Sequence, residues 1–214
     1  MDSPEYAVEG MRFAHKHSSV HLQRYLAFKR AADVIFSLIA FVILCIPMMI
    51  IALLIKLDSS GPVLFKQERL GLNGTPFMIY KFRSMRTDAE KDGPKWAEKE
   101  DKRCTKVGAF LRKSRLDELP QLFNILKGEM SFVGPRPERA FFYHKFTKDI
   151  PDFPKRLQVK PGLTGLAQVN GGYELKPEEK LQYDMEYIQR RNILLDLKCM
   201  VKTVRLVFTH EGAR

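Results

Sequence analysis

One uninterrupted apolar run, Val34–Ile55, limits what this chain can fold into. It reads VIFSLIAFVILCIPMMIIALLI, carries no charge, and has Ser37 as its only hydroxyl. As a helix it would extend about 33 Å, close to the hydrocarbon thickness of a bilayer. A cleaved signal peptide does not fit, because the run is too long and starts far from the N-terminus. We therefore predict a membrane helix; the alternative is a fully buried helix in a soluble core.

A proline inside the run leaves two membrane topologies open. Pro47 lacks an N–H and clashes with the carbonyl of Ile43, so the helix should kink there. A spanning helix usually keeps its basic residues on one side of the membrane. Here both flanks are basic, with Arg24, Lys29 and Arg30 before the run and Lys56, Lys66 and Arg69 after it. This pattern fits a re-entrant helix with both ends on the cytoplasmic face, and a kinked spanning helix is the alternative.

The charge balance points to an anionic partner. Lys plus Arg number 36 against 25 for Asp plus Glu, which gives a net charge of +11. Nucleic acid, a phosphorylated substrate or anionic lipid would each match that surplus. The three cysteines form no CxxC pair, which favours reduced thiols over a disulfide or zinc framework. The sequence also lacks GxxxxGK[ST], GxGxxG, HExxH and GxSxG, which argues against nucleoside triphosphate hydrolysis and against serine or zinc hydrolysis.

The rest of the chain predicts a mainly helical α+β fold with a small β-hairpin. Strands are predicted over Val63–Gln67 and Pro76–Phe82, with Lys81 and Arg83 at the end of the second. Residues 86–107 are crowded with charges, contain Trp96 and are predicted to form a surface loop. From Pro177 onward the pattern is helical, ending in a basic amphipathic helix that fits either a membrane surface or the protein core.

These elements suggest three parts. Residues 1–32 form a polar N-terminus and an interfacial lead-in helix, residues 33–57 the membrane helix, and residues 58–214 a single compact catalytic domain. In the third part, residues 108–129 have helical periodicity, but Pro120 is tolerated only in a first helical turn. A helix should therefore begin or kink near Asp117, which places Asp117 and Glu118 at a helix N-terminus.

Two adjacent acids within a basic cluster are the strongest candidates for chemistry. The cluster reads Arg112-Lys113-Ser114-Arg115-Leu116-Asp117-Glu118. A carboxylate can attack phosphorus if a divalent metal and nearby cations neutralise the phosphate. Asp117, Glu118, Arg112 and Arg136 could supply these groups, although such clusters are usually surface salt bridges. A membrane anchor favours the catalytic interpretation, because it makes a lipid phosphate an obvious substrate.

Several longer motifs resemble one known family, the bacterial sugar transferases, which are small monotopic phosphoglycosyl transferases. The resemblance covers residues 24–210 in order. The motifs are Lys81-Phe82-Arg83-Ser84-Met85, Leu116–Asn124 (LDELPQLFN), Lys127–Pro137 (KGEMSFVGPRP), Pro161–Gly171 (PGLTGLAQVNG), and Asp184 with Tyr187. Larger members of the family carry additional N-terminal membrane domains, so the resemblance implies the minimal catalytic form.

The resemblance implies a reaction and its partners. Such enzymes move a sugar-1-phosphate from a UDP-sugar to undecaprenyl phosphate and release UMP. They act at the cytoplasmic face of the bacterial inner membrane, in the first membrane step of surface glycan synthesis, upstream of further glycosyltransferases. Mg²⁺ is the expected cofactor, membrane lipids are partners, and nucleic acid is not. The sequence leaves open a homodimer, the sugar and the glycan pathway.

The resemblance also implies residue roles. Asp117 would be the nucleophile that forms a covalent phospho-sugar intermediate, and Glu118 its acidic neighbour; both are candidate Mg²⁺ ligands. The candidate phosphate contacts are Arg112, Arg136, Lys81 and Arg83, and the candidate substrate and nucleotide loops contain Pro135, Gln168 and Asn170. The family's membrane helix is re-entrant, which favours a bend at Pro47.

Two positions depart from the family pattern, and two alternatives remain. Ile46 stands where many relatives have a serine before the kinking proline, and Gly172 stands where some have an arginine that touches the nucleotide. A membrane-anchored module that binds anionic lipid or nucleic acid without turnover is one alternative. A hydrolase that uses the same acids with water as acceptor is the other.

Overall fold

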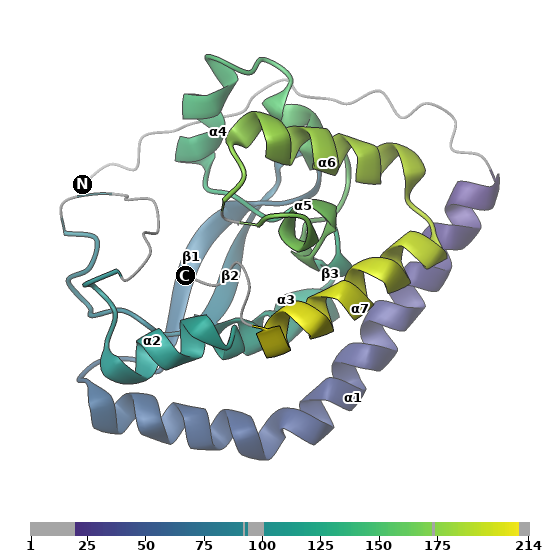
Figure 1. The fold of residues 1–214 in the computed structure, drawn as a ribbon. Coiled ribbons are helices and arrows are strands. Elements are labelled where there is room, and N and C mark those ends of the chain that lie inside the picture. Colours follow the sequence, from purple (N-terminus) through teal and green to yellow (C-terminus); the bar gives the residue numbers. More distant parts are fainter. Residues whose placement is uncertain (1–19, 92, 94–100, 173, 210–214) are drawn as a thin grey trace.

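The computed structural model describes residues 20–91, 93, 101–172 and 174–209. This part is mainly helical and contains two small two-stranded sheets, which agrees with the predicted fold class (Figure 1). The helices are α1 (Val20–Asp58), α2 (Lys106–Lys113), α3 (Leu122–Lys127), α4 (Ala140–Thr147), α5 (Leu166–Val169), α6 (Pro177–Arg190) and α7 (Ile193–Thr209). Short 3-10 helices are η1 (Leu72–Gly74), η2 (Leu116–Gln121) and η3 (Phe153–Gln158).

Helix α1 contains the whole apolar run, so the predicted helix is confirmed. The predicted lead-in and membrane segments form one continuous helix of 39 residues, long and apolar enough to cross a membrane. Only 11% of its most apolar stretch is buried against the protein. Figure 1 shows α1 changing direction along its length beneath the other elements. Pro47 is the proline inside this helix, and proline is the residue type that most often bends helices.

The first half of α1 is attached to the globular part through polar side chains. Arg30 donates hydrogen bonds of 2.6 and 2.7 Å to carbonyls near the end of α3. Asp33 accepts from Ser131 Oγ at 3.1 Å and from the backbone N–H of Phe132 at 3.0 Å. Lys29 lies 2.7 Å from the Asp196 carboxylate on α7. These contacts fix the N-terminal half of the helix on α3 and α7.

The second half of α1 is attached to the opposite side of the same globular part. Ile51 and Ile55 are buried and pack with Phe82 and Leu111. Beyond the helix, Arg83 donates to backbone carbonyls at its C-terminal end, as described below. Both halves of the helix therefore contact one folded unit.

The first sheet is the predicted hairpin. Strand β1 (Leu64–Leu70) runs antiparallel to β2 (Pro76–Phe82), with Leu64 opposite Phe82 and Leu70 opposite Pro76. Alternate residues of β2, Phe77 and Ile79, are buried against α3. The hairpin thus backs onto the segment that carries the paired acids, with Lys81 near the acids themselves.

The second sheet was not predicted. Strand β3 (Ser131–Val133) pairs in parallel with β4 (Gly162–Thr164), where the sequence indicated a stiff turn and a glycine-rich loop with a short β-like core. The two backbones approach so closely that a Cβ on Gly162 would lie 2.1 Å from the nitrogen of Gly134. Glycine at both positions permits this approach, and strands of three residues leave too little alternation to recognise.

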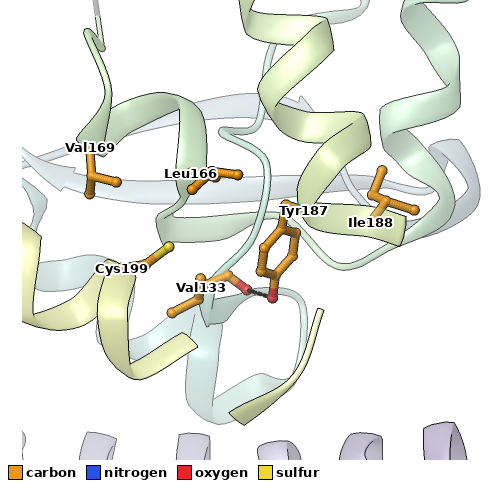
Figure 2. Packing of buried hydrophobic residues seen from close by; sticks show 6 residues of the cluster. All are labelled: Val133, Leu166, Val169, Tyr187, Ile188 and Cys199. Carbon is orange, nitrogen blue, oxygen red and sulfur yellow. Dashed lines mark hydrogen bonds between the residues drawn. The ribbon is translucent and has the colours of Figure 1, made fainter. Parts of the chain in front are cut away.

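Helices α6 and α7 complete the core around this second sheet. Figure 2 shows the cluster formed by Val133, Leu166, Val169, Tyr187, Ile188 and Cys199. The Tyr187 hydroxyl donates a hydrogen bond of 3.1 Å to the carbonyl of Val133. Because a buried hydroxyl needs a partner, this bond fixes α6 against β3.

Helix α7 packs on the core, which is one of the two alternatives that its sequence allowed. Cys199 is fully buried in the core, whereas Leu194, Val201 and Val204 on the other side are 78%, 70% and 57% exposed. The helix therefore packs on the core with one face and leaves an apolar face uncovered. Its location at a membrane interface stays a prediction, and Trp96 lies outside the described residues.

Candidate active site

The chain breaks as predicted just before the paired acids. Helix α2 ends at Lys113, and Arg115 takes a left-handed conformation with φ 58° before η2 begins at Leu116. Asp117 and Glu118 lie in the first turn of η2, and the backbone N–H of Glu118 donates to the carbonyl of Arg115 at 3.2 Å. This local turn separates the two acids from the regular helix that periodicity alone would suggest.

Glu118 is held by two cations from distant parts of the chain. Lys81, at the end of β2, donates to its Oε1 at 2.7 Å, and Arg136 donates to both of its oxygens, to Oε2 at 3.4 Å. Burial alone would raise the pKa of Glu118, but the charges of Arg136 and Lys81 outweigh it and lower the pKa. Glu118 is therefore ionised at neutral pH.

Asp117 is in a different environment, although it is the adjacent residue. It is buried, with 7% of its surface exposed. Burial raises the pKa of Asp117 to about 6; Lys81 opposes this shift and the Glu118 charge adds to it. One acid is thus fixed as an anion by cations, and its neighbour is a desolvated carboxylate that titrates near neutral pH. Paired groups with separated pKa values are typical of catalytic sites.

Arg112 and Arg136, two of the predicted phosphate contacts, lie near these acids. Arg136 is bound to Glu118, whereas Arg112 has other partners. Arg112 donates to the Cys104 sulfur at 3.3 Å and lies 3.9 Å from the Asp101 carboxylate. Its charge, like that of Arg136, lowers the pKa of Asp117. The structure therefore places both arginines within electrostatic reach of the proposed nucleophile.

Arg83 occupies a different position from that of a simple phosphate ligand. Its guanidinium donates at 2.7 Å to the carbonyls of Ser59 and Ser60 and at 2.8 Å to the Ser59 hydroxyl. These carbonyls directly follow helix α1, so Arg83 anchors the C-terminal end of that helix to the hairpin. It also lines the cavity described next, and its contact with phosphate stays a prediction.

A cavity of about 640 Å³ opens beside Asp117. Its lining is strongly basic, because it contains twelve lysines and arginines and only three acidic residues. The acidic residues are Glu90, Asp117 and Glu138. The predicted site residues in this lining are Lys81, Arg83, Arg112, Asp117, Arg136 and Gln168. The size of a cavity does not identify its ligand. A basic lining around a buried carboxylate, however, suits a polyanionic ligand such as a diphosphate.

The other two predicted loop residues support the site from outside the cavity. The carbonyl of Pro135 accepts from the N–H of Gly162 at 2.9 Å, which joins the two strands of the second sheet. Asn170 donates to the carbonyl of Leu166 and accepts from Lys202 on α7 at 3.0 Å. Among the residues that the structure describes, neither lines the cavity.

Sequence reasoning missed two basic residues of the cavity lining. These are Arg156 of η3 and Lys180 of α6, and Arg156 is paired with Asp184 at 2.5 Å. Asp184 belongs to a motif that the resemblance singled out, but its partner lies 28 residues away and no local pattern joins the two. Arg156 is one basic residue beside a proline-containing turn, and no sequence motif marks it as part of a site.

The carboxylates Asp117 and Glu118 are the residues that fit Mg²⁺ by chemistry. Within the described ranges, no group of three or more potential metal-ligating side chains comes together. Mg²⁺ commonly binds through one or two carboxylates, with water and substrate phosphates as its other ligands. Two adjacent carboxylates beside this basic cavity satisfy that requirement.

Comparison with known proteins gives a consistent picture. The family model described as bacterial sugar transferase matches residues 24–210. The UDP-N-acetylgalactosamine-undecaprenyl-phosphate N-acetylgalactosaminephosphotransferase of Aeromonas hydrophila is 43% identical over 193 residues, which are 89% of this chain and 46% of that protein. The UDP-glucose:undecaprenyl-phosphate glucose-1-phosphate transferase of Klebsiella pneumoniae is 42% identical over 88% of this chain and 42% of that protein.

This chain thus spans less than half the length of those two relatives. The exopolysaccharide production protein PSS of Rhizobium leguminosarum is 41% identical over 191 residues, which are 84% of this chain and 94% of that protein. The match covers most of the apolar helix α1, the hairpin, the paired acids and the helices behind them. On these grounds the chain belongs to the bacterial sugar transferase family.

Proposed function

We propose that this protein transfers a sugar-1-phosphate from a UDP-sugar to undecaprenyl phosphate and releases UMP. The observation that carries the proposal is the buried carboxylate of Asp117 in a cavity lined by cations, in a chain whose apolar helix is mostly uncovered. The names of the relatives from Aeromonas and Klebsiella support the donor and the acceptor.

In the first step, a carboxylate oxygen of Asp117 attacks the phosphorus that carries the sugar. The bond between that phosphorus and the bridging oxygen breaks, and UMP leaves with the bonding electrons. Attack requires the ionised form of Asp117. Lys81, Arg112 and Arg136 lie where they can offset the charge that builds on the phosphoryl oxygens.

In the second step, an oxygen of undecaprenyl phosphate attacks the same phosphorus. The acyl phosphate bond breaks, the Asp117 carboxylate is restored, and the product is a lipid diphosphate sugar. Two steps through one carboxylate let two bulky anionic substrates use a single cavity in turn. A bound Mg²⁺ held by Asp117 or Glu118 would supply additional neutralisation of phosphate charge.

We further propose that α1 is a re-entrant helix. Its N-terminal half is tied to α7 through Lys29 and Asp196, and its C-terminal end is tied to the hairpin through Arg83. One folded unit contacts both ends of the helix. If the helix crossed the bilayer, its two ends would lie on opposite sides, and the same unit could not contact both. The bend seen in Figure 1 and the proline at position 47 support the same topology.

Cysteine labelling tests this topology. His21→Cys and Ser60→Cys place thiols on exposed residues near the start of α1 and just after its end, and Gln158→Cys marks the globular part. With a membrane-impermeant maleimide, we expect all three variants to label above the wild-type background in inside-out vesicles and none in intact spheroplasts. Labelling of positions 21 and 60 from opposite sides would show a spanning helix instead.

The rate of the first step should depend on pH through Asp117. Its pKa is raised to about 6, so the reactive carboxylate is present above that pH and is lost below it. We expect the single-turnover rate of UMP release to be level above about pH 7 and to fall about tenfold per unit well below pH 6. A rate that stays constant down to pH 4.5 would exclude a nucleophile with this raised pKa.

The proposed reaction itself is tested by UMP release from a panel of UDP-sugars, with and without undecaprenyl phosphate and Mg²⁺. A transferase should release about one UMP per protein without the lipid and turn over continuously with it. Continuous turnover without lipid would indicate a hydrolase, and no release with any donor would leave only an anionic-lipid-binding module. We expect turnover at the cytoplasmic face of the inner membrane, upstream of further glycosyltransferases that extend the lipid-linked sugar.

A further inference from the structure

Residues 134–138, which carry Arg136, form a short and stiff connection between two parts of the fold. Pro135 and Pro137 stand on either side of Arg136, and each proline ring fixes its own φ angle at about −65°. We refer to residues 134–138 as the bridge segment. Because its backbone has so few freely rotating bonds, the position of the Arg136 side chain depends on how the two ends of the segment are held.

The start of the bridge segment is held by the second sheet. The N–H of Gly134 donates to the carbonyl of Thr164 at 2.9 Å, and the carbonyl of Pro135 accepts from the N–H of Gly162 at the same distance. These are backbone hydrogen bonds to β4, so they do not depend on the identity of a polar side chain. One end of the segment is therefore fixed by the sheet itself.

The other end of the bridge segment is held by Arg69 of β1, through its side chain. Arg69 Nη1 donates to the carbonyl of Pro137 at 3.3 Å and to Oε2 of Glu138 at 3.2 Å. Its Nη2 donates to Gln67 Oε1 at 2.6 Å, which orients the guanidinium. The N–H of Leu70 adds a backbone bond of 3.0 Å to the carbonyl of Glu138. We refer to the pair Arg69 and Glu138 as the clasp.

The acid of the clasp lies where an acid opposes ligand binding. Glu138 is 8% exposed and lines the basic cavity, so its negative charge repels an anionic ligand there. Its pairing with Arg69 gives it a different use, because a planar guanidinium can bind a carboxylate and a carbonyl in one fixed geometry. Arg69 lines the cavity too, but both of its terminal nitrogens donate to acceptors of the protein. The contacts of the clasp are therefore those of a holding device.

The residue held between the two ends faces the paired acids. Arg136 donates to both oxygens of Glu118, to Oε2 at 3.4 Å, and it lines the cavity together with Asp117. A displacement of about 1 Å in a catalytic site can lower a rate by about 100-fold. Release of one end of the bridge segment would allow such a displacement of the Arg136 guanidinium.

We propose that Arg69 is a positioning residue, which with Glu138 clasps the bridge segment to β1 and so holds Arg136 on Glu118, beside Asp117. The expected effect on rate rests on the proposed function, because Arg136 there offsets charge on the transferred phosphoryl group. The clasp itself does not touch the reacting atoms, and it acts through Arg136.

The sign of one charge effect tests the proposal without turnover. Glu138→Gln removes a negative charge from the cavity, so charge alone predicts tighter binding of inorganic diphosphate to the full chain in detergent. If the clasp positions Arg136, we expect calorimetric titration to show binding about 3- to 10-fold weaker instead. Glu68→Gln makes the same change at an exposed residue of β1 outside the cavity lining, and should bind diphosphate within about twofold of wild type. Unchanged or tighter binding in Glu138→Gln would overturn the proposal.

A double-mutant cycle with Arg136 tests the same proposal by rate. Arg69→Gln and Glu138→Gln should each lower single-turnover UMP release by roughly 10- to 100-fold. In an Arg136→Gln background, the same two substitutions should cost less than about threefold, because the residue that they position is absent. Partial unfolding would lower the rate by the same factor in both backgrounds, so equal effects in both would overturn the proposal.

The two experiments also separate this proposal from the proposed function. A wild-type chain that releases no UMP from any UDP-sugar would remove the proposed function. The diphosphate titration would still decide whether the clasp shapes the phosphate-binding part of the cavity, because it requires no donor and no turnover.

Discussion

Asp117→Asn is expected to lower UMP release from the UDP-sugar by at least about 10³-fold, because an amide cannot attack phosphorus and no acyl phosphate can form. Asp117→Ala should have the same effect, which excludes residual activity from slow deamidation of the asparagine. Release is measured with and without undecaprenyl phosphate. Activity within tenfold of wild type in both variants would remove Asp117 as the nucleophile.

The same substitution should make the protein more stable, which shows that lost activity is not lost folding. Because burial raises the pKa of Asp117 to about 6, the folded state binds this proton more tightly than the unfolded state. This carboxyl therefore favours the folded state below about pH 4, and that contribution is lost as the pH rises through 6. At pH 7.5 we expect Asp117→Asn to raise the free energy of unfolding by about 1–3 kcal/mol. Thermal midpoints in detergent at pH 4.5 and 7.5 measure the difference, which should appear only at the higher pH.

Asp184→Asn is expected to cause the largest loss of stability, about 3–5 kcal/mol. Asp184 and Arg156 are paired at 2.5 Å, and each side chain is only 1% exposed. Removing the carboxylate leaves the arginine charge buried without its partner, and breaking such a pair costs more than the pair itself contributes. The measurement is the thermal midpoint of the purified protein beside that of Glu186→Gln, which breaks an exposed pair with Arg190 on the same helix.

A double variant separates the charge effect from simple loss of packing. Arg156→Met combined with Asp184→Leu removes both charges and keeps apolar volume, so most of the lost stability should return. The exposed control, Glu186→Gln, should change stability by less than about 1 kcal/mol. If Asp184→Asn is as stable as this control, the buried pair does not have the importance that we assign to it.

Local patterns in the sequence were sufficient to predict much of the fold. The uncharged run predicts α1, alternation and a glycine turn predict the hairpin, and Pro120 predicts the break that places Asp117 in a first turn. Each of these signals lies within a few residues of the feature that it predicts, so no tertiary information is needed.

The features that were not predicted depend on contacts between distant segments. Strands β3 and β4 pair through a close approach at Gly134 and Gly162, and Arg83 ends α1 through carbonyls more than twenty residues earlier. The composition of the cavity is equally non-local, since its arginines come from the hairpin, the paired-acid segment and η3. Sequence reasoning identified the two acids, but the separate settings of Asp117 and Glu118 follow from Lys81 and Arg136, which only folding brings beside them.

The most direct test of the central claim is to identify the residue that carries the phospho-sugar. Incubation with a UDP-sugar but without lipid, followed by an acid quench, should trap the intermediate; borohydride reduction then converts an acyl phosphate to the alcohol. We expect mass spectrometry of the digested chain to find homoserine at position 117, dependent on the donor and absent when undecaprenyl phosphate is added before the quench. A mark at Glu118 or elsewhere, or no mark in a protein that still releases UMP, would contradict the account.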